Sequence, residues 1–110
     1  MIQYRDIVSL DLLILGILNQ KDYYVYEMYT FIDEKSDGKL NIKEGVLYAS
    51  IYKLLNDNYI SKREEIINGR VRVYYHLEPK GKKFFNELKQ NFESGAEAIR
   101  KIIYKGGENG

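Results

Sequence analysis

Two segments decide the fold of this chain, GVLYASIYKLL (residues 45–55) and RVRVYYHLE (residues 70–78). In the first, apolar residues recur every three or four positions, which predicts a helix over residues 43–58 with a buried stripe of Leu47, Ile51, Leu54 and Leu55. In the second, apolar and polar residues alternate as in a half-buried strand. The turn signal Asn68-Gly69 precedes it, because both central residues of a type I′ turn need positive φ. We therefore predict a helix followed by a hairpin with strands over residues 59–67 and 71–77.

Three more helices accompany this unit in the sequence. Apolar residues at helical spacing predict them over residues 6–19, 24–35 and 79–105. Pro79 is tolerated in the first turn of the last helix. At about 26 residues that helix is roughly 39 Å long, which is too long for so small a core to cover. Its distal half is therefore expected to pack against a second subunit through Leu88, Phe92, Ala96, Ile99 and Ile103. Residues 106–110 are expected to be disordered.

Length and composition indicate one globular domain. A chain of 110 residues with 45% hydrophobic and 30% charged residues is near the common size for a single core. Within this compact unit, residues 1–78 form the expected binding domain and residues 79–105 a dimerisation helix. The absence of cysteine fits a reducing cytoplasm. All apolar runs fall short of the roughly 20 residues that cross a bilayer, so we expect a soluble cytoplasmic protein with no membrane contact.

Positive charge gathers in the predicted helix and hairpin, although the net charge of the chain is only +1. Residues 41–83 hold nine basic and five acidic side chains, a net +4, against −3 for residues 1–40 and zero for residues 84–110. This is a modest electrostatic footprint for a polyanion.

Catalysis and metal binding find little support in the residue types. His76 is the single histidine and there is no cysteine, so the sequence offers no second imidazole or thiolate for a metal site. The adjacent carboxylates at positions 33–34 and 64–65 point in different directions on a helix or strand. No phosphate-binding glycine loop precedes a helix. We expect neither an enzyme nor a cofactor, and we expect most of the eleven tyrosines to pack in the core or at its rim.

The order of predicted elements is three helices, a hairpin and a long helix. This is the order of a winged helix-turn-helix, a mainly α fold with a two-stranded β-wing, here with an appended C-terminal helix. In such folds the start of the third helix meets the major groove of DNA, and the wing meets phosphates or the adjacent minor groove. The residues placed for the groove are Lys43, Val46, Ser50 and Lys53, and those placed for phosphates are Lys62, Arg63, Arg70 and Arg72. The alternative is that all of these are ordinary solvated surface residues.

The chain resembles the PadR family of bacterial transcription regulators, in particular its small members with a single C-terminal helix. The similarity lies in LILGIL (residues 13–18), YVYE (24–27), KEGVLY (43–48), GRVRVYY (69–75) and PKGK (79–82). These segments are similar to the family's Leu-Gly-Leu-Leu, His-Gly-Tyr-Glu, Ser-Glu-Gly-Thr-Leu-Tyr, Gly-Arg-(Pro)-Arg-Lys-Tyr-Tyr and Glu-Lys-Gly-Arg patterns. The chain departs from the family at Val25, Val46 and Ala49, which bears on the operator sequence more than on DNA binding itself.

The resemblance implies a homodimeric repressor that clamps a pseudo-palindromic operator in double-stranded DNA. Carried over by position, its DNA contacts are Tyr26, Lys43, Val46, Tyr48, Gly69, Arg70 and Arg72. Some small members bind flat aromatic ligands in a pore between the subunits, using a tryptophan that this chain lacks. The corresponding pore residues are Leu10, Ile14, Phe92, Ala96 and Ile99, and a filled hydrophobic interface is the equal alternative.

The sequence therefore predicts a dimeric winged-helix repressor, with release from DNA by a small planar hydrophobic ligand as an open hypothesis. Two other interpretations stay open. The near-neutral net charge leaves room for a winged-helix module that binds a partner protein without sequence-specific DNA binding. The chain is also compatible with a small-molecule sensor whose DNA binding is secondary.

Overall fold

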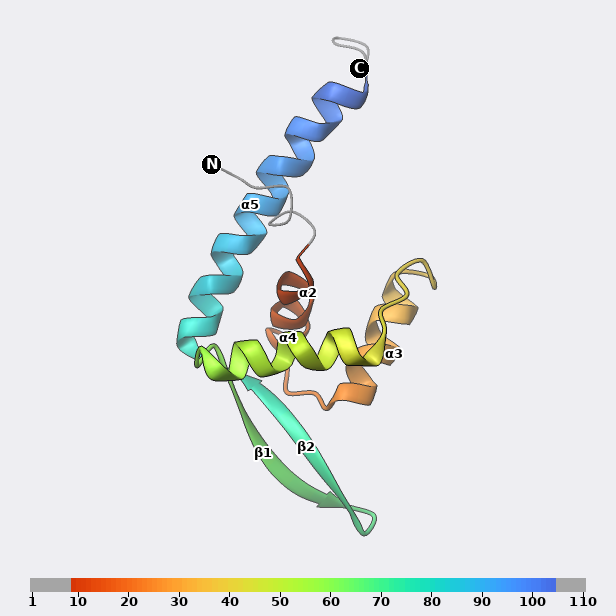
Figure 1. Cartoon of the computed structure of the whole chain (residues 1–110), viewed down its shortest axis with the longest axis vertical. Coiled ribbons are helices and arrows are strands. Elements are labelled where there is room, and N and C mark those ends of the chain that lie inside the picture. The colour runs from red at the N-terminus through yellow and green to blue at the C-terminus, as the bar shows by residue number, and fades with distance from the viewer. Residues whose placement is uncertain (1–8, 105–110) are drawn as a thin grey trace.

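Residues 9–104 form three short helices, a two-stranded hairpin and one long helix. The computed structural model describes residues 9–104 (Figure 1). In chain order its elements are α2 (Leu10–Leu18), α3 (Val25–Lys35), α4 (Glu44–Asn56), β1 (Ile60–Ile67), β2 (Arg70–Leu77) and α5 (Pro79–Ile103). The predicted mainly helical fold with a β-hairpin after the third helix is confirmed. The predicted helical residues 6–8, residue 105 and the predicted disordered tail at residues 106–110 lie outside the described residues.

The helix ends correct several predicted boundaries. Ser9 has the extended backbone of an N-cap, and its side chain accepts a 3.1 Å hydrogen bond from the Asp11 N–H, so α2 begins at Leu10. The prediction that this helix includes Ser9 is wrong. The apolar spacing continues upstream of Ser9, whereas the helix begins only after this N-cap residue. At the other side of the core, Asn58 has a φ of 62°, so α4 stops short of its predicted end.

The core is built around α2, which packs against α3, α4, α5 and β2. The buried hydrophobic side chains come from every element of the described chain and are Ile14, Leu15, Ile17, Leu18, Val25, Met28, Ile32, Leu47, Ile51, Leu54, Ile60, Tyr75, Phe85 and Leu88. Leu55, expected in the buried stripe of α4, is only half-buried. A Cβ on Gly16 would lie 3.3 Å from Cε1 of Phe85, so this glycine lets α5 approach α2 closely.

The hairpin is a wing that extends from the core on the side opposite to α5 (Figure 1). Its strands pair in antiparallel register from Ile60–Leu77 at the base to Ile67–Arg70 at the tip. Asn68 and Gly69 both have positive φ, 51° and 77°, as the predicted turn requires. Alternating burial holds only at the base. Val71 near the tip is 61% exposed because the hairpin projects beyond the core.

The long helix α5 is fixed to the core at its start and leaves it further along. A Cβ on Gly81 would lie 2.0 Å from the carbonyl oxygen of Tyr59, so only glycine fits this close crossing. Beyond Leu88, which is buried within the chain, the apolar residues Phe92, Ile99 and Ile103 are exposed. In the part of the chain that the structure describes, no helix combines the length and apolar character needed to span a bilayer.

Candidate nucleic-acid interface

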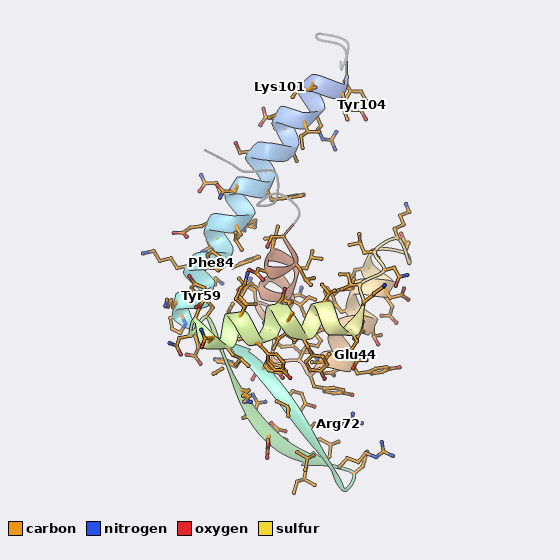
Figure 2. All side chains as sticks on the ribbon, in the orientation of Figure 1. Glu44, Tyr59, Arg72, Phe84, Lys101 and Tyr104 are labelled. Atoms are coloured by element: carbon orange, nitrogen blue, oxygen red, sulfur yellow. The ribbon has the colours of Figure 1, made fainter. Side chains whose placement is uncertain are left out.

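A groove separates the start of α3 and the exposed side of α4 from the wing. Its volume is about 400 Å³, and it is lined by aromatic, aliphatic and basic residues: Tyr24, Val25, Tyr26, Tyr48, Tyr52, Lys62, Val71, Arg72, Val73 and Tyr75. Figure 2 labels Glu44 at the start of α4 and Arg72 on the wing, the two elements that border the groove. Two of the predicted DNA-contacting tyrosines, Tyr26 and Tyr48, therefore share one surface with wing residues.

Tyrosines dominate this groove, and sequence reasoning selected only two of the five. Tyr26 is 69% and Tyr52 59% exposed, so neither serves core packing. Tyr48 and Tyr52 lie one helical turn apart, with ring centroids 5.9 Å from each other. That i, i+4 spacing was the available signal for Tyr52. Burial raises the pKa of Tyr75, and the neighbouring Tyr48 and Tyr52 act in the same direction. The phenol of Tyr75 is therefore a hydrogen-bond donor at neutral pH.

The start of α4 presents small and basic residues to solvent. Lys43 occupies the N-cap position, and Val46 is 54% exposed. Gly45 and Ala49 are also exposed, and Ser50 is half-buried. The unpaired N–H groups at a helix start attract anions such as phosphate, and the positive charge of Lys43 acts in the same direction. This end of α4 can therefore approach a phosphate backbone or a base edge closely.

Lys53 lies in a different environment from the other predicted groove residues. Its Nζ lies 2.7 Å from Oδ2 of Asp11, a carboxylate whose side chain is only 9% exposed. Removing Lys53 would leave this buried carboxylate without its ion-pair partner, so Lys53 has a structural role in tying α4 to α2. The side chain of Lys53 itself is 61% exposed.

The basic residues of the wing fall into two groups. Lys62 and Arg70 are exposed, and Gly69 at the tip is exposed as well. The guanidinium of Arg72 lies 4.7 Å from the ring centroid of Tyr24, within cation–π distance, at the edge of the groove. Arg63 instead hydrogen-bonds to two carboxylates within the chain, those of Asp22 and Glu65.

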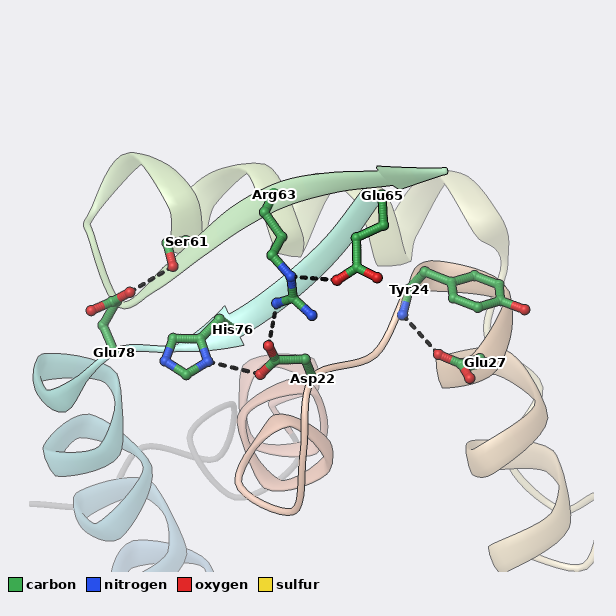
Figure 3. Close-up of polar contacts among 8 residues, drawn as sticks. All are labelled: Asp22, Tyr24, Glu27, Ser61, Arg63, Glu65, His76 and Glu78. Atoms are coloured by element: carbon green, nitrogen blue, oxygen red, sulfur yellow. Dashed lines mark hydrogen bonds and ion pairs between the residues drawn. The ribbon is translucent and has the colours of Figure 1, made fainter. Parts of the chain in front are cut away.

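Asp22 belongs to a polar cluster at the base of the wing (Figure 3). Its Oδ1 lies 2.7 Å from Nδ1 of His76, and its Oδ2 accepts from Arg63. Partial burial alone would raise the pKa of Asp22, but the hydrogen bonds and charges of His76 and Arg63 outweigh it and lower the pKa overall. Hydrogen bonds to Asp22 and Glu65 raise the pKa of Arg63. The sequence carried no signal for this cluster, because position 22 reads only as a polar helix stop.

The predicted pore and dimer residues differ in exposure. Ile14 is fully buried and Leu88 is 7% exposed within the single chain. Leu10 and Ala96 are half-buried, whereas Phe92, Ile99 and Ile103 are 41%, 37% and 67% exposed. An apolar cavity of about 330 Å³ does exist between α2, α3 and the start of α5, but it shares no residue with the predicted pore. Among residues 9–104, no group of acidic or histidine side chains is placed to hold a metal ion.

Three helices followed by a wing and a long helix, with the α4–wing groove on one side, define a winged helix-turn-helix protein. Residues 14–87 match the family model of the transcriptional regulator PadR-like family, and the chain belongs to that family. The family resemblance predicted from the motifs is therefore confirmed. So is the prediction of a transcription regulator rather than an enzyme.

Relatives and solved structures agree with this assignment. A protein of Lysinibacillus sphaericus is 31% identical over 91 residues, which cover 82% of this chain and 84% of the relative. A transcriptional regulator from Clostridium thermocellum is 29% identical, with a TM-score of 0.81 over 86% of this chain and 93% of that one. A PadR family regulator from Clostridium difficile is 27% identical, with a TM-score of 0.74 over 86% and 97% of the two chains. Bacillus subtilis PadR, solved with operator DNA, has a TM-score of 0.66 over 72% of this chain and 45% of that one, and at 22% identity it shows the fold alone.

Proposed function

We propose that this regulator is a homodimeric repressor that occupies a pseudo-palindromic operator in double-stranded DNA. The observation that carries the proposal is the groove between α4 and the wing, where tyrosine hydroxyls and the side chains of Lys62 and Arg72 line one surface. Phosphate contacts come mostly from arginine, lysine and hydroxyl side chains and from helix N-termini, and this surface offers each of them.

The two sides of the groove have different roles in this proposal. The start of α4, with Lys43, Val46 and Ser50, faces base edges in the major groove. The wing, with Gly69, Arg70 and Arg72, contacts phosphates beside it. Tyr26 and Tyr48 lie between the two and donate to the DNA backbone. Base contacts then set sequence preference, and the wing and tyrosines set affinity and register.

Dimerisation is the second part of the proposal. Beyond Leu88, α5 carries an apolar stripe that the described chain leaves exposed, with Phe92, Ile99 and Ile103 on it. A second copy related by a two-fold axis would cover both stripes at once. Two wings on one duplex require half-sites about one helical turn apart, roughly 34 Å between centres.

Ligand release is the third part, and it is tied to the dimer. Phe92 and Ile99 are partly exposed in the single chain, which leaves apolar surface for a flat aromatic ligand between the subunits. Fluorescence titration of the dimer with a planar aromatic cation tests this. Saturable binding that lowers DNA affinity supports release, whereas a dimer without such binding has a filled interface.

DNA binding is tested by selecting duplex fragments from the region upstream of the gene that encodes this protein and measuring their affinity at several salt concentrations. Each phosphate contact contributes a slope of about −0.9 in the plot of log affinity against log salt. We expect a steep slope and a footprint with two-fold symmetry. Binding that is absent for all duplexes, or independent of salt, contradicts the proposal and favours the protein-interaction module.

A further inference from the structure

We propose that Asp22, in the loop between α2 and α3, is the residue that holds the wing at the angle needed for DNA binding, through its contacts with Arg63 and His76. The inference rests on the DNA-binding function proposed above. It assigns a positioning role to a loop that makes no DNA contact in that proposal.

The α2–α3 loop lies against the edge of β2 that does not pair with β1. One edge of β2 pairs with β1. On its other edge, the Tyr75 N–H donates a 2.9 Å hydrogen bond to the carbonyl oxygen of Tyr23, an isolated antiparallel bridge. Ile60 and Tyr75 at the base of the hairpin are buried in the core, whereas Ile66 and Val71 near the tip are exposed, so this bridge attaches the wing only near its base.

Asp22 adds a second attachment that reaches both strands. One carboxylate oxygen binds Arg63 of β1 and the other lies 2.7 Å from Nδ1 of His76 on β2 (Figure 3). His76 pairs with Ser61 across the hairpin, and paired residues share a face. Arg63 is two positions from Ser61 on β1, so it lies on the same face as His76. A single carboxylate therefore cross-links the two strands and ties them to the loop, which resists rotation about the backbone bridge.

The same loop reaches the DNA-facing groove. The ring of Tyr24 meets that of Tyr74 edge to face, with centroids 5.4 Å apart. The guanidinium of Arg72 also lies over the ring of Tyr24. A shift of the loop relative to the wing would therefore move a groove-lining arginine as well as the wing itself.

Arg63 takes a different role from the one its sequence position suggested. Its Nε–H and Nη1–H donate to Glu65 and Asp22, so two of its five N–H donors are engaged in charge-assisted hydrogen bonds within the chain. We assign it to holding the wing rather than to holding the DNA.

Other charged groups surround His76 as well. Besides Asp22 and Arg63, Lys21, Glu78 and Lys82 line the same cleft of about 410 Å³. Lys82 donates to Asn19 at 2.7 Å, and Glu78 accepts from Ser61 at 2.5 Å, so both already have partners. Asp22 is the carboxylate that His76 contacts.

The decisive variant is Asp22→Asn, because two explanations predict opposite signs. Removing a negative charge from any surface raises affinity for a polyanion. Loss of the wing attachment instead lowers affinity, by about fivefold if the lost coupling is that of an exposed ion pair at the upper end of its usual range. Asp33→Asn, on the exposed side of α3, makes the same charge change away from the wing and is the matched control. An Asp22→Asn affinity equal to or above that of Asp33→Asn overturns the inference.

Two further variants test the attachment. His76→Gln removes one of the two partners of Asp22 and should lower DNA affinity. Asp22→Glu keeps the charge and should recover part of the affinity that Asp22→Asn loses.

A measurement without DNA keeps the test independent of the proposed function. Amide hydrogen exchange at Tyr75 reports the bridge to Tyr23, and it should accelerate in Asp22→Asn and in His76→Gln while core amides of α2 stay protected. If no variant and no wild type binds any duplex, the proposed function fails, yet accelerated exchange still supports the wing attachment. Unchanged exchange at Tyr75 in both variants overturns it.

Discussion

At the scale of single residues, Gly81 is a position where the fold leaves no room for a side chain. An added Cβ would lie 2.0 Å from the Tyr59 carbonyl oxygen and 2.8 Å from Cδ1 of Leu77. Gly81→Ala should therefore lower the free energy of unfolding by about 2 kcal/mol or more, as overpacking of a core does. Gly45→Ala is the control, because an added Cβ there meets nothing within 4 Å and the helix should gain about 0.5–1 kcal/mol. Thermal unfolding measures both, and a Gly81→Ala protein as stable as the wild type would contradict this crossing.

Asp22 predicts how stability depends on pH. The pKa of Asp22 lies below its ordinary value of 3.8 in the folded chain, so the ionised group stabilises the fold above that pH. That contribution is lost as pH falls through 3.8 and then through the lower folded pKa. The difference in melting temperature between wild type and Asp22→Asn should therefore be full well above pH 3.8 and shrink as the pH falls below 3.8. A difference that stays constant over this range would show that the carboxylate has no folded-state partners.

At the scale of elements, the hairpin and its turn could be predicted because they depend on local chemistry. Asn68 and Gly69 supply the positive φ values by themselves. The start of α2 could not be placed by periodicity, since the apolar spacing continues on both sides of Ser9 and gives no sign of the N-cap there. The cluster of Asp22, Arg63 and His76 was beyond sequence reasoning for another reason. Its members are 41 and 54 positions apart from Asp22 and meet only when the wing folds against the loop.

The residues proposed to contact DNA show the same division. Basic side chains in an alternating strand suggested Arg70 and Arg72, and both lie on the wing outside the core. Tyr75 is buried in the core, as expected for most of the tyrosines. Tyr24 and Tyr52 were overlooked because tyrosine fits equally well in a core. Only the shared groove separates them from packing residues.

The wing arginines carry a prediction about affinity rather than specificity. Arg70→Ala removes an exposed cation from the wing, so the salt slope should lose about 0.9 and affinity should fall by a similar factor on every duplex. Ser50→Ala on α4 should instead change the order of preference among duplexes. Fluorescence anisotropy on a panel of duplexes at several salt concentrations measures both. Lys101→Ala at the far end of α5 removes the same charge and should leave slope and preference unchanged. Identical profiles for Arg70→Ala and Ser50→Ala would contradict the division of roles.

At the scale of the whole molecule, the wing and the distal half of α5 point in opposite directions from the core (Figure 1). An assembly through α5 would therefore leave both wings free, and contact with DNA would not compete with contact between subunits. Operator affinity then depends on an apolar surface far from any DNA contact, because each wing contributes to one site only when the two copies are joined.

That dependence gives the final prediction. Ile103→Asp places a charge on the exposed stripe of α5, where the isoleucine is 67% exposed and a second copy would bury it. Sedimentation should show a monomer that keeps its helical content, and affinity for an operator with two half-sites should fall by about 100-fold, the lower end of what linking two sites gains. Ile66→Asp at the wing tip, 76% exposed, is the control for a new charge on an exposed isoleucine and should remain dimeric. An Ile103→Asp protein that stays dimeric would move the subunit interface away from this stripe. A monomer that binds the full operator as tightly as the wild type would instead show that one wing suffices.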